Sequence, residues 1–117
     1  MSREAAGCPL CEIIYEGAPA TIVREWDQAI AIIPLNPVVE GHTSVIPTAH
    51  VEDYTTDPSV SAEVMRCAAE IAPYPSNVIT SAGVAATQSV RHLHLHIVPR
   101  KEDDGLALPW YSGKRKK

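Results

Sequence analysis

Three histidines alternate with aliphatic residues in the segment 92–98 of the 117-residue sequence, which reads HLHLHIV. In a β-strand successive side chains face opposite ways, so His92, His94 and His96 would share one face while the aliphatic residues between them enter the core. Packing does not require such a row, because Thr or Val suits a strand face better and neighbouring imidazolium groups repel one another. The row therefore indicates chemistry rather than structure.

Two chemical functions of this row remain open: all three histidines bind a metal, or one of them is a nucleophile flanked by helpers. The preceding loop favours the nucleophile. It contains small residues at 83–87 followed by Ser89, which offer backbone N–H groups and a hydroxyl to an anion such as a phosphate. A neutral imidazole is a good nucleophile toward phosphorus when a hydrogen-bond acceptor holds its other nitrogen.

A second group of reactive residues lies near the N-terminus, where Cys8 and Cys11 form a Cys-x-x-Cys motif. By itself this motif is compatible with a redox pair, half of a zinc site or a chance occurrence. A redox pair of the thioredoxin type needs a βαβ unit around it, which these N-terminal residues do not supply. A structural zinc site takes four nitrogen or sulfur ligands, so two more must come from elsewhere, and His50 and His92 are the candidates.

The composition is typical of a compact single-domain protein. The 117 residues are 45% hydrophobic and 21% charged, which is enough for one core and too short a chain for two. The net charge of −4 argues against a protein that mainly coats nucleic acid or anionic lipid. Basic residues gather at 113–117, which we expect to form a flexible tail after a single domain at 1–112.

Targeting and membrane signals are not evident. No segment has the roughly 18 consecutive apolar residues that span a bilayer, and the N-terminus leads into no apolar signal core. We therefore expect a cytoplasmic protein without a membrane partner. Cys67 falls within a helical pattern and is expected to be a small buried hydrophobic residue.

Hydrophobic periodicity and turn residues predict a small α+β fold. Gly17 and Pro19 should end a short helix at about 11–16, and Asp57 with Pro58 should begin an amphipathic helix that runs up to Pro73. Runs of β-branched residues predict strands at 21–24, 29–33, 42–47, 77–81 and 92–98. Because the helical and strand patterns are segregated, an antiparallel sheet with one main helix is favoured over a doubly wound fold.

Together these segments resemble the histidine-triad (HIT) family of nucleotide hydrolases and transferases. The family signature is His-φ-His-φ-His-φ-φ, where φ is hydrophobic, and residues 92–98 match it. The resemblance extends along the chain, in the family's order, to the segments Asn36-Pro37, Gly41-His42, Ile46-Pro47-Thr48-Ala49-His50, Gln88-Ser89-Val90 and Pro99-Arg100. It covers roughly Cys8 to Trp110, which is nearly the whole chain.

The resemblance implies a HIT-like fold with a five-stranded antiparallel sheet, one main helix and a short N-terminal helix. It also implies cleavage at the α-phosphate of a purine nucleotide, either a nucleoside phosphoramidate or a dinucleoside polyphosphate. His94 would attack phosphorus to form a covalent nucleotidyl-histidine, which water then hydrolyses, and His92 would lie beside it. His96 would contact the phosphate oxygens and Ser89 the phosphate or the leaving group. The substrate-binding set implied in this way comprises Ser81, Gln88, Ser89 and His96.

The same resemblance implies a zinc ion and a homodimer. One branch of the family has a Cys-x-x-Cys, a histidine after the Ile-Pro segment and the first triad histidine as zinc ligands, which here are Cys8, Cys11, His50 and His92. His42 is expected to be a structural, hydrogen-bonded histidine. HIT proteins pair through the long helix and a neighbouring strand, and we expect a partner to cover the apolar helix face formed by Val60, Val64, Cys67 and Ile71.

Three positions depart from the family pattern. Pro34 stands where an Asp or Asn commonly holds the ribose hydroxyls, Ser81 where an Asn or Gln is usual near the phosphate, and Thr87 where a glycine is usual. These departures keep a second interpretation open, a nucleotide-binding or interaction module with weak or no activity. A third, a zinc-dependent nucleic-acid binder that uses the basic tail, is disfavoured by the net charge and by the lack of interleaved aromatic and basic residues.

Overall fold

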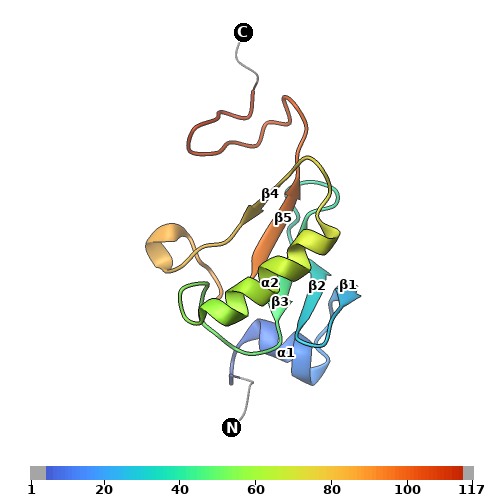
Figure 1. Ribbon diagram of the computed structural model, residues 1–117, viewed down its shortest axis with the longest axis vertical. Coiled ribbons are helices and arrows are strands. Elements are labelled where there is room, and N and C mark those ends of the chain that lie inside the picture. The colour runs from blue at the N-terminus through green and yellow to red at the C-terminus, as the bar shows by residue number, and fades with distance from the viewer. Residues whose placement is uncertain (1–4, 115–117) are drawn as a thin grey trace.

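The computed structural model describes residues 5–114, which form an α+β unit (Figure 1). Its elements, in chain order, are α1 (Pro9–Glu16), β1 (Thr21–Glu25), β2 (Ala29–Ile33), β3 (Thr43–Pro47), α2 (Pro58–Ile71), β4 (Ser76–Ile79), the short 3₁₀ helix η1 (Val84–Ala86) and β5 (Leu95–Pro99). The expected five strands, main helix and short N-terminal helix are confirmed.

The five strands form one antiparallel sheet in the order β1-β2-β3-β5-β4. The central strand β3 pairs on one side with β2, where Ser44 lies opposite Ile32, and on the other side with β5, where Ser44 lies opposite His96. This register places residues from distant parts of the sequence in one row across the sheet. The row is the frame on which the candidate site is built.

The fifth strand is shorter than the sequence pattern predicted. It begins at Leu95 rather than at His92, because the backbone before it bonds to a loop instead of the sheet: the N–H of Leu93 donates to the carbonyl of Val51 at 2.8 Å. The alternation of side chains nevertheless continues through this segment. Leu93, Leu95 and Ile97 are all buried in one hydrophobic cluster, so the histidines between them are directed elsewhere.

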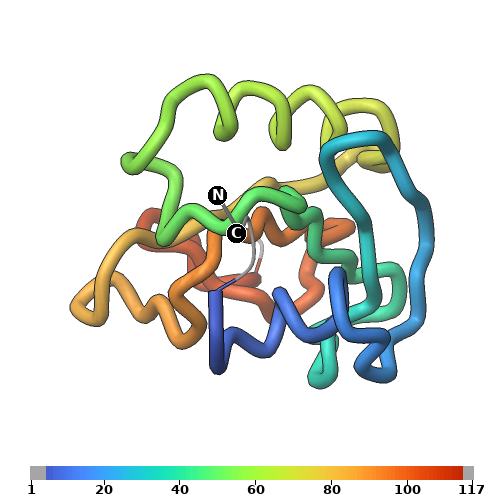
Figure 2. Tube along the Cα trace, turned by 90° about the horizontal axis from the view of Figure 1, so that it is seen from below, coloured from blue at the N-terminus to red at the C-terminus, as the bar shows by residue number. Residues whose placement is uncertain are grey.

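Helix α2 covers one face of the sheet (Figures 1 and 2). Its N-cap is Asp57, whose carboxylate accepts the N–H of Ser59 at 3.0 Å, and Pro58 is the first helical residue, as the sequence predicted. Val64 and Cys67 are fully buried in the cluster that holds Leu93 and Leu95. Val60 and Ile71 pack against the same cluster and are partly buried. The chain's own sheet therefore covers much of this apolar face, and the expected homodimer stays a prediction.

Helix α1 lies on the opposite face of the sheet from α2 (Figure 2). Its aliphatic side chains Leu10, Ile13 and Ile14 pack against Ile30, Ile32 and Ile46 of β2 and β3. Gly17 ends the helix with φ of 69°, a left-handed conformation that glycine adopts without strain. The two helices therefore leave part of the α1 face of the sheet open, next to the histidines.

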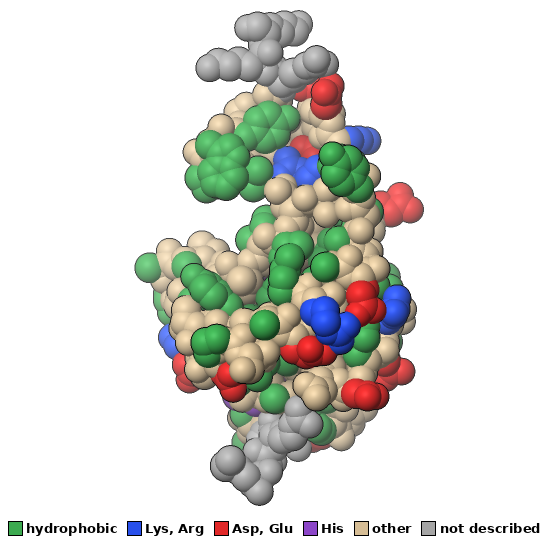
Figure 3. All heavy atoms as spheres, viewed as in Figure 1, with side chains coloured by type: hydrophobic (Ala, Val, Ile, Leu, Met, Phe, Trp, Pro, Cys, Tyr) green, Lys and Arg blue, Asp and Glu red, His purple; other side chains and the backbone are tan. Residues whose placement is uncertain are grey.

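The C-terminal segment 100–114 projects from the body, where Figure 3 shows hydrophobic side chains on its surface. Arg100 anchors it: the guanidinium pairs with the nearly buried carboxylate of Asp104 at 2.8 Å and donates to Asn77 Oδ1 and the carbonyl of Leu106, each at 2.6 Å. Of the predicted tail 113–117, residues 115–117 lie outside the described part of the chain. No helix among the described residues is long and apolar enough to cross a membrane.

Candidate active site and metal site

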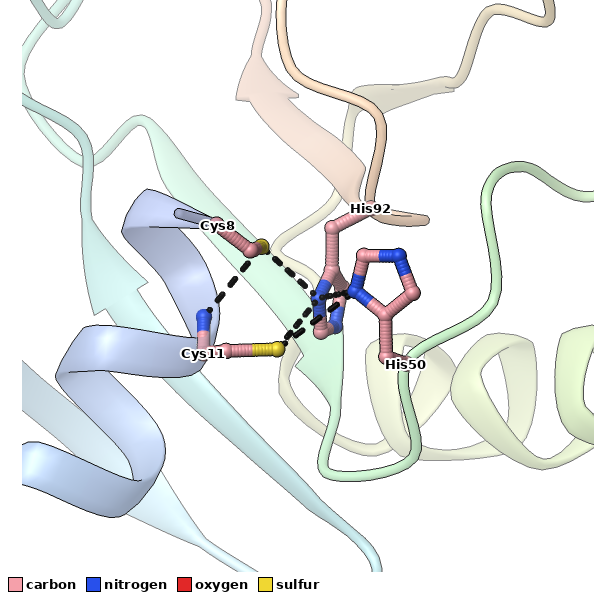
Figure 4. A group of neighbouring side chains, drawn as sticks. All are labelled: Cys8, Cys11, His50 and His92. Carbon is pink, nitrogen blue, oxygen red and sulfur yellow. Dashed lines mark hydrogen bonds between the residues drawn. The ribbon is translucent and has the colours of Figure 1, made fainter. Parts of the chain in front are cut away.

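Cys8, Cys11, His50 and His92 come together in the structure, each offering one ligand atom, and the four atoms lie within 4.8 Å of one another (Figure 4). They come from three parts of the chain. Cys8 is the N-cap of α1 and its Sγ accepts the N–H of Cys11 at 3.4 Å, while His50 follows β3 and His92 precedes β5. The cluster thus joins the N-terminal helix to the loops at the end of the sheet.

Four of the distances within this cluster are close to those around a tetrahedral metal ion. The two Nδ1 atoms of His50 and His92 are 3.1 Å apart, and the sulfur to Nδ1 distances are 3.4, 3.4 and 3.6 Å. Tetrahedral zinc with ordinary bond lengths needs about 3.3 Å between two nitrogens and about 3.5 Å between nitrogen and sulfur. The donor set, two cysteines and two histidines, is one that structural zinc sites use.

The ring of His92 is oriented for this task by the sheet. Its Nε2 lies 2.9 Å from the carbonyl oxygen of Pro47, which accepts only, so Nε2 carries the proton and Nδ1 presents its lone pair to the cluster. Burial lowers the pKa of His92 to about 4, so its imidazole is neutral, as a metal ligand must be. The residues present could therefore hold a metal ion.

His94 has the opposite tautomer to His92, with its proton on Nδ1. Its Nδ1 donates to the backbone carbonyl of His92 at 2.7 Å, which leaves the Nε2 lone pair free. The ring lines a pocket of about 810 Å³ on the α1 face of the sheet. An imidazole with one nitrogen held by a carbonyl and the other exposed to a pocket can act as a nucleophile or as a base.

His96 accepts a hydrogen bond at the end of a hydrogen-bond chain that begins in the loop before β3. The N–H of Val38 donates to Nδ1 of His42 at 3.0 Å, so the proton of a neutral His42 is on Nε2, which lies 2.9 Å from Nδ1 of His96. Nδ1 of His96 is then the acceptor, and its own proton is on Nε2. His96 therefore offers an N–H donor, and its ring centroid is 5.0 Å from that of His94.

Burial keeps this pair of histidines neutral. It is the main reason that the pKa of His96 falls to about 4, and the nearby rings of His94 and His42 lower it further. Burial also lowers the pKa of His42. His42 must be neutral for this hydrogen-bond chain to form, because a doubly protonated ring could not accept a hydrogen bond from the N–H of Val38.

The loop before the triad is braced by Gln88. Its Oε1 accepts the N–H of Gly83 at 2.8 Å, and its Nε2 donates to the carbonyls of Glu52 at 2.6 Å and Val90 at 3.0 Å. Thr87 has φ of 71°, in the left-handed region where glycine is the easier residue. These contacts hold Ser89 at the wall of the pocket.

Not every expected substrate contact faces the pocket. Ser89, His94 and His96 line it, whereas Ser81 and Gln88 are not among its lining residues. The amide of Gln88 is used within the loop, so its expected role in substrate binding would have to be indirect. Ser44, which was not predicted, lines the pocket and lies 3.3 Å from Nδ1 of His96 through its Oγ. The alternation of His42, Ser44 and Ile46 along their strand was the available signal.

Comparisons with known proteins agree with this fold and geometry. The HIT domain family model matches residues 16–103. The chain is 33% identical over 111 residues to adenylylsulfatase HINT3 of Arabidopsis thaliana, covering 85% of this chain and 55% of that protein. It is 29% identical over 113 residues to adenosine 5′-monophosphoramidase HNT1 of Saccharomyces cerevisiae, covering 90% of this chain and 70% of that protein.

A solved structure with the same fold is that of a HIT family hydrolase from Clostridium thermocellum. It superposes with a TM-score of 0.75 at 30% identity and covers 89% of this chain and 98% of the other. The family model spans most of the chain, including the sheet, α2 and all three alternating histidines. The chain therefore belongs to the HIT domain family.

Proposed function

We propose that this protein is a nucleotide hydrolase or transferase that cleaves at the α-phosphate of a purine nucleotide through a covalent intermediate on His94. The observation that carries the proposal is the orientation of two rings. His94 has Nδ1 bound to the carbonyl of His92 and a free Nε2 lone pair, and His96 beside it offers an Nε2–H donor.

In the first step the Nε2 lone pair of His94 attacks the α-phosphorus. A bond forms between nitrogen and phosphorus, and the bond from phosphorus to the leaving group breaks with its electron pair going to that group, which takes a proton from water. The imidazole ring then carries a positive charge, which the carbonyl of His92 stabilises through its 2.7 Å contact with Nδ1.

In the second step water attacks the same phosphorus. The phosphorus–nitrogen bond breaks, its electrons return to Nε2 of His94, and the nucleoside monophosphate is released. The attacking water gives up one proton to the solvent, which replaces the proton that the leaving group took in the first step. The Nε2–H of His96 and the hydroxyl of Ser89 are the donors available to the equatorial phosphate oxygens in both steps, because both residues line the pocket with His94. Splitting the displacement in two lowers the barrier of each part.

We further propose that the metal site holds structural zinc. Zinc would supply a crosslink between α1 and the loops that carry His50 and His92, and no chemical step requires it. His92 would link this crosslink to the reaction, since its ring faces the cysteines while its carbonyl orients His94.

The named relatives support the substrate class. One is an adenosine 5′-monophosphoramidase and another an adenylylsulfatase, so both act on an adenylyl group with different leaving groups. We propose nucleoside phosphoramidates as the first class to test and dinucleoside polyphosphates as the second.

The test is to trap the intermediate. The protein should be mixed with an adenosine phosphoramidate labelled at the α-phosphate and quenched during turnover. We expect label on the protein that is stable in base and lost in acid, as a phosphorus–nitrogen bond to histidine requires. His94→Ala should carry no label and should lose at least about a thousandfold in kcat, with zinc content and melting temperature unchanged. Full activity in that variant would overturn the assignment, and an inert wild type would favour a binding module.

A further inference from the structure

The pocket beside the histidines has two chemically different groups of lining residues. One group is the histidine rings with Ser44 and Ser89, and the other is aliphatic side chains from α1 and β2, among them Leu10, Ile13 and Ile32. None of the described residues that line the pocket is an Asp, Glu, Lys or Arg. The hydroxyl and imidazole N–H donors suit an anionic group such as a phosphate, and the aliphatic side chains suit an apolar group.

The strand register locates the middle of this pocket. Ser44 pairs with His96 on one side and with Ile32 on the other, so the three lie in one row across the sheet. Strands are about 4.8 Å apart, which puts Ile32 about 10 Å from His96. Pro34 lies two residues after Ile32, and side chains two positions apart in an extended chain face the same side. Pro34 also lines the pocket.

A nucleotide bound with its phosphate at His94 and His96 would therefore extend its sugar toward Ile32 and Pro34 and its base toward α1. To distinguish ribose from deoxyribose, a site needs a polar group that pairs with the sugar hydroxyls and is left unpaired when they are missing. The side chains of Ile32 and Pro34 neither donate nor accept a hydrogen bond.

We propose that this pocket selects its substrate by the apolar fit of the base and does not read the sugar hydroxyls, so that ribonucleotides and deoxyribonucleotides are both substrates, with Pro34 as the residue that sets this tolerance. This inference rests on the proposed function and adds the class of sugar to it.

The experiment compares kcat/KM for the 5′-phosphoramidates of adenosine, 2′-deoxyadenosine and 2′,3′-dideoxyadenosine. We expect the three values to agree within about threefold. Pro34→Asp places a carboxylate at the same position and should raise the preference for the ribonucleotide to about tenfold or more, because the carboxylate pairs with the hydroxyls and is unpaired without them. Pro34→Ala, the matched control, removes the ring without adding an acceptor and should keep the ratio of the wild type.

A wild-type preference for ribose above about tenfold would overturn the inference, and loss of that preference in Asn36→Ala would show that the exposed Asn36 at the pocket reads the hydroxyls instead. A ratio in Pro34→Asp equal to that in Pro34→Ala would overturn the role of Pro34. Metal content and melting temperature identify variants that have not folded.

Failure of the proposed function would look different. If the wild type hydrolyses none of the three compounds, the same comparison is made by calorimetric binding of AMP, dAMP and ddAMP. Dissociation constants within about threefold support the inference without any turnover, and tighter binding of AMP by more than about tenfold contradicts it.

Discussion

His42 has a more specific part in the site than the structural role that its sequence context suggested. Its ring accepts from Val38 at Nδ1 and donates from Nε2 to His96, which decides which nitrogen of His96 carries the proton. A residue that acts in this way is a positioning residue. Its removal should change the N–H donor that His96 presents to the pocket without changing His94, the proposed nucleophile.

This role of His42 predicts a difference between two substitutions. His42→Ala should lower kcat by about tenfold to a hundredfold, because His96 loses the donor that holds its proton on Nε2. His42→Gln retains an N–H near the position of Nε2 and should recover a large part of that loss. The measurement is steady-state kinetics with an adenosine phosphoramidate. Equal losses in the two variants would indicate that His42 only fills space.

The lowered pKa of His96 predicts a dependence of stability on pH. In the native protein its pKa is about 4, against 6.5 for the unperturbed group, so between these values the unfolded chain binds a proton that the native protein does not. The contribution of His96 to the free energy of unfolding should therefore have its full value above about pH 6.5 and should decrease as the pH falls toward 4.

Urea unfolding of the wild type and of His96→Asn at pH 5 and pH 7.5 isolates this contribution, because the other histidines titrate in both proteins. The wild type should lose more free energy of unfolding between the two pH values than the variant does. An equal loss in the two proteins would contradict the assignment of this pH dependence to His96.

Among the elements, α1 depends most on the proposed metal. It has eight residues, which is too short for a stable helix by itself, and its only fully buried residue is Cys11, one of the proposed metal ligands. Its aliphatic side chains pack on β2 and β3, but the cysteines at its N-terminal end face the two histidines. The helix also contributes Leu10 and Ile13 to the pocket, so its position affects the shape of the pocket as well as the fold.

We predict one zinc ion per chain, measured by metal analysis of the purified protein. Cys8→Ser should lower the zinc content and the melting temperature, since a structural metal contributes free energy of folding. It should also lower kcat. Without the metal the ring of His92 is no longer fixed, and the backbone carbonyl of His92, which orients His94, becomes less well positioned. Cys67→Ser, at the buried cysteine of α2, is the matched control and should retain zinc. A melting temperature that does not change when a chelator is added would contradict the zinc assignment.

For the molecule as a whole, the sheet covers much of the apolar face of α2, with Val64 and Cys67 fully buried. Exposed apolar side chains lie near one edge of the sheet. Strand β4 is at the edge of the sheet, and near it Tyr74 is fully exposed and Ile79 is 40% exposed. The projecting C-terminal segment adds Trp110, which is 80% exposed. Exposed edge strands with apolar neighbours are a common place for chains to pair.

We therefore propose a homodimer that forms through this edge. Light scattering across micromolar concentrations should give twice the chain mass of 12.7 kDa. Ile79→Lys, which adds a charge at the edge, should shift the protein toward the monomer. A monomer in the wild type over the whole range would contradict the proposal and leave the exposed aromatic residues without an explanation.

Much of the fold followed from local patterns in the sequence. The alternation in HLHLHIV predicted that Leu93, Leu95 and Ile97 enter the core, and they do. Asp57 and Pro58 marked the beginning of the main helix, and Gly17 marked the end of the short one. These features could be predicted because hydrophobic periodicity, capping and left-handed glycine conformations depend on residues that are neighbours in the chain.

The arrangement of the site was decided by contacts between distant residues. The sequence could nominate Cys8 and His92 as partners, but their 3.4 Å contact spans 84 positions in the chain. It could not show that the fifth strand begins at Leu95, that His42 reaches His96, or that the sheet itself covers α2. Each of these features depends on which groups of the folded chain come into contact. Buried polar groups form hydrogen bonds with the partners that folding brings within reach, so their pairing is decided only in the tertiary structure.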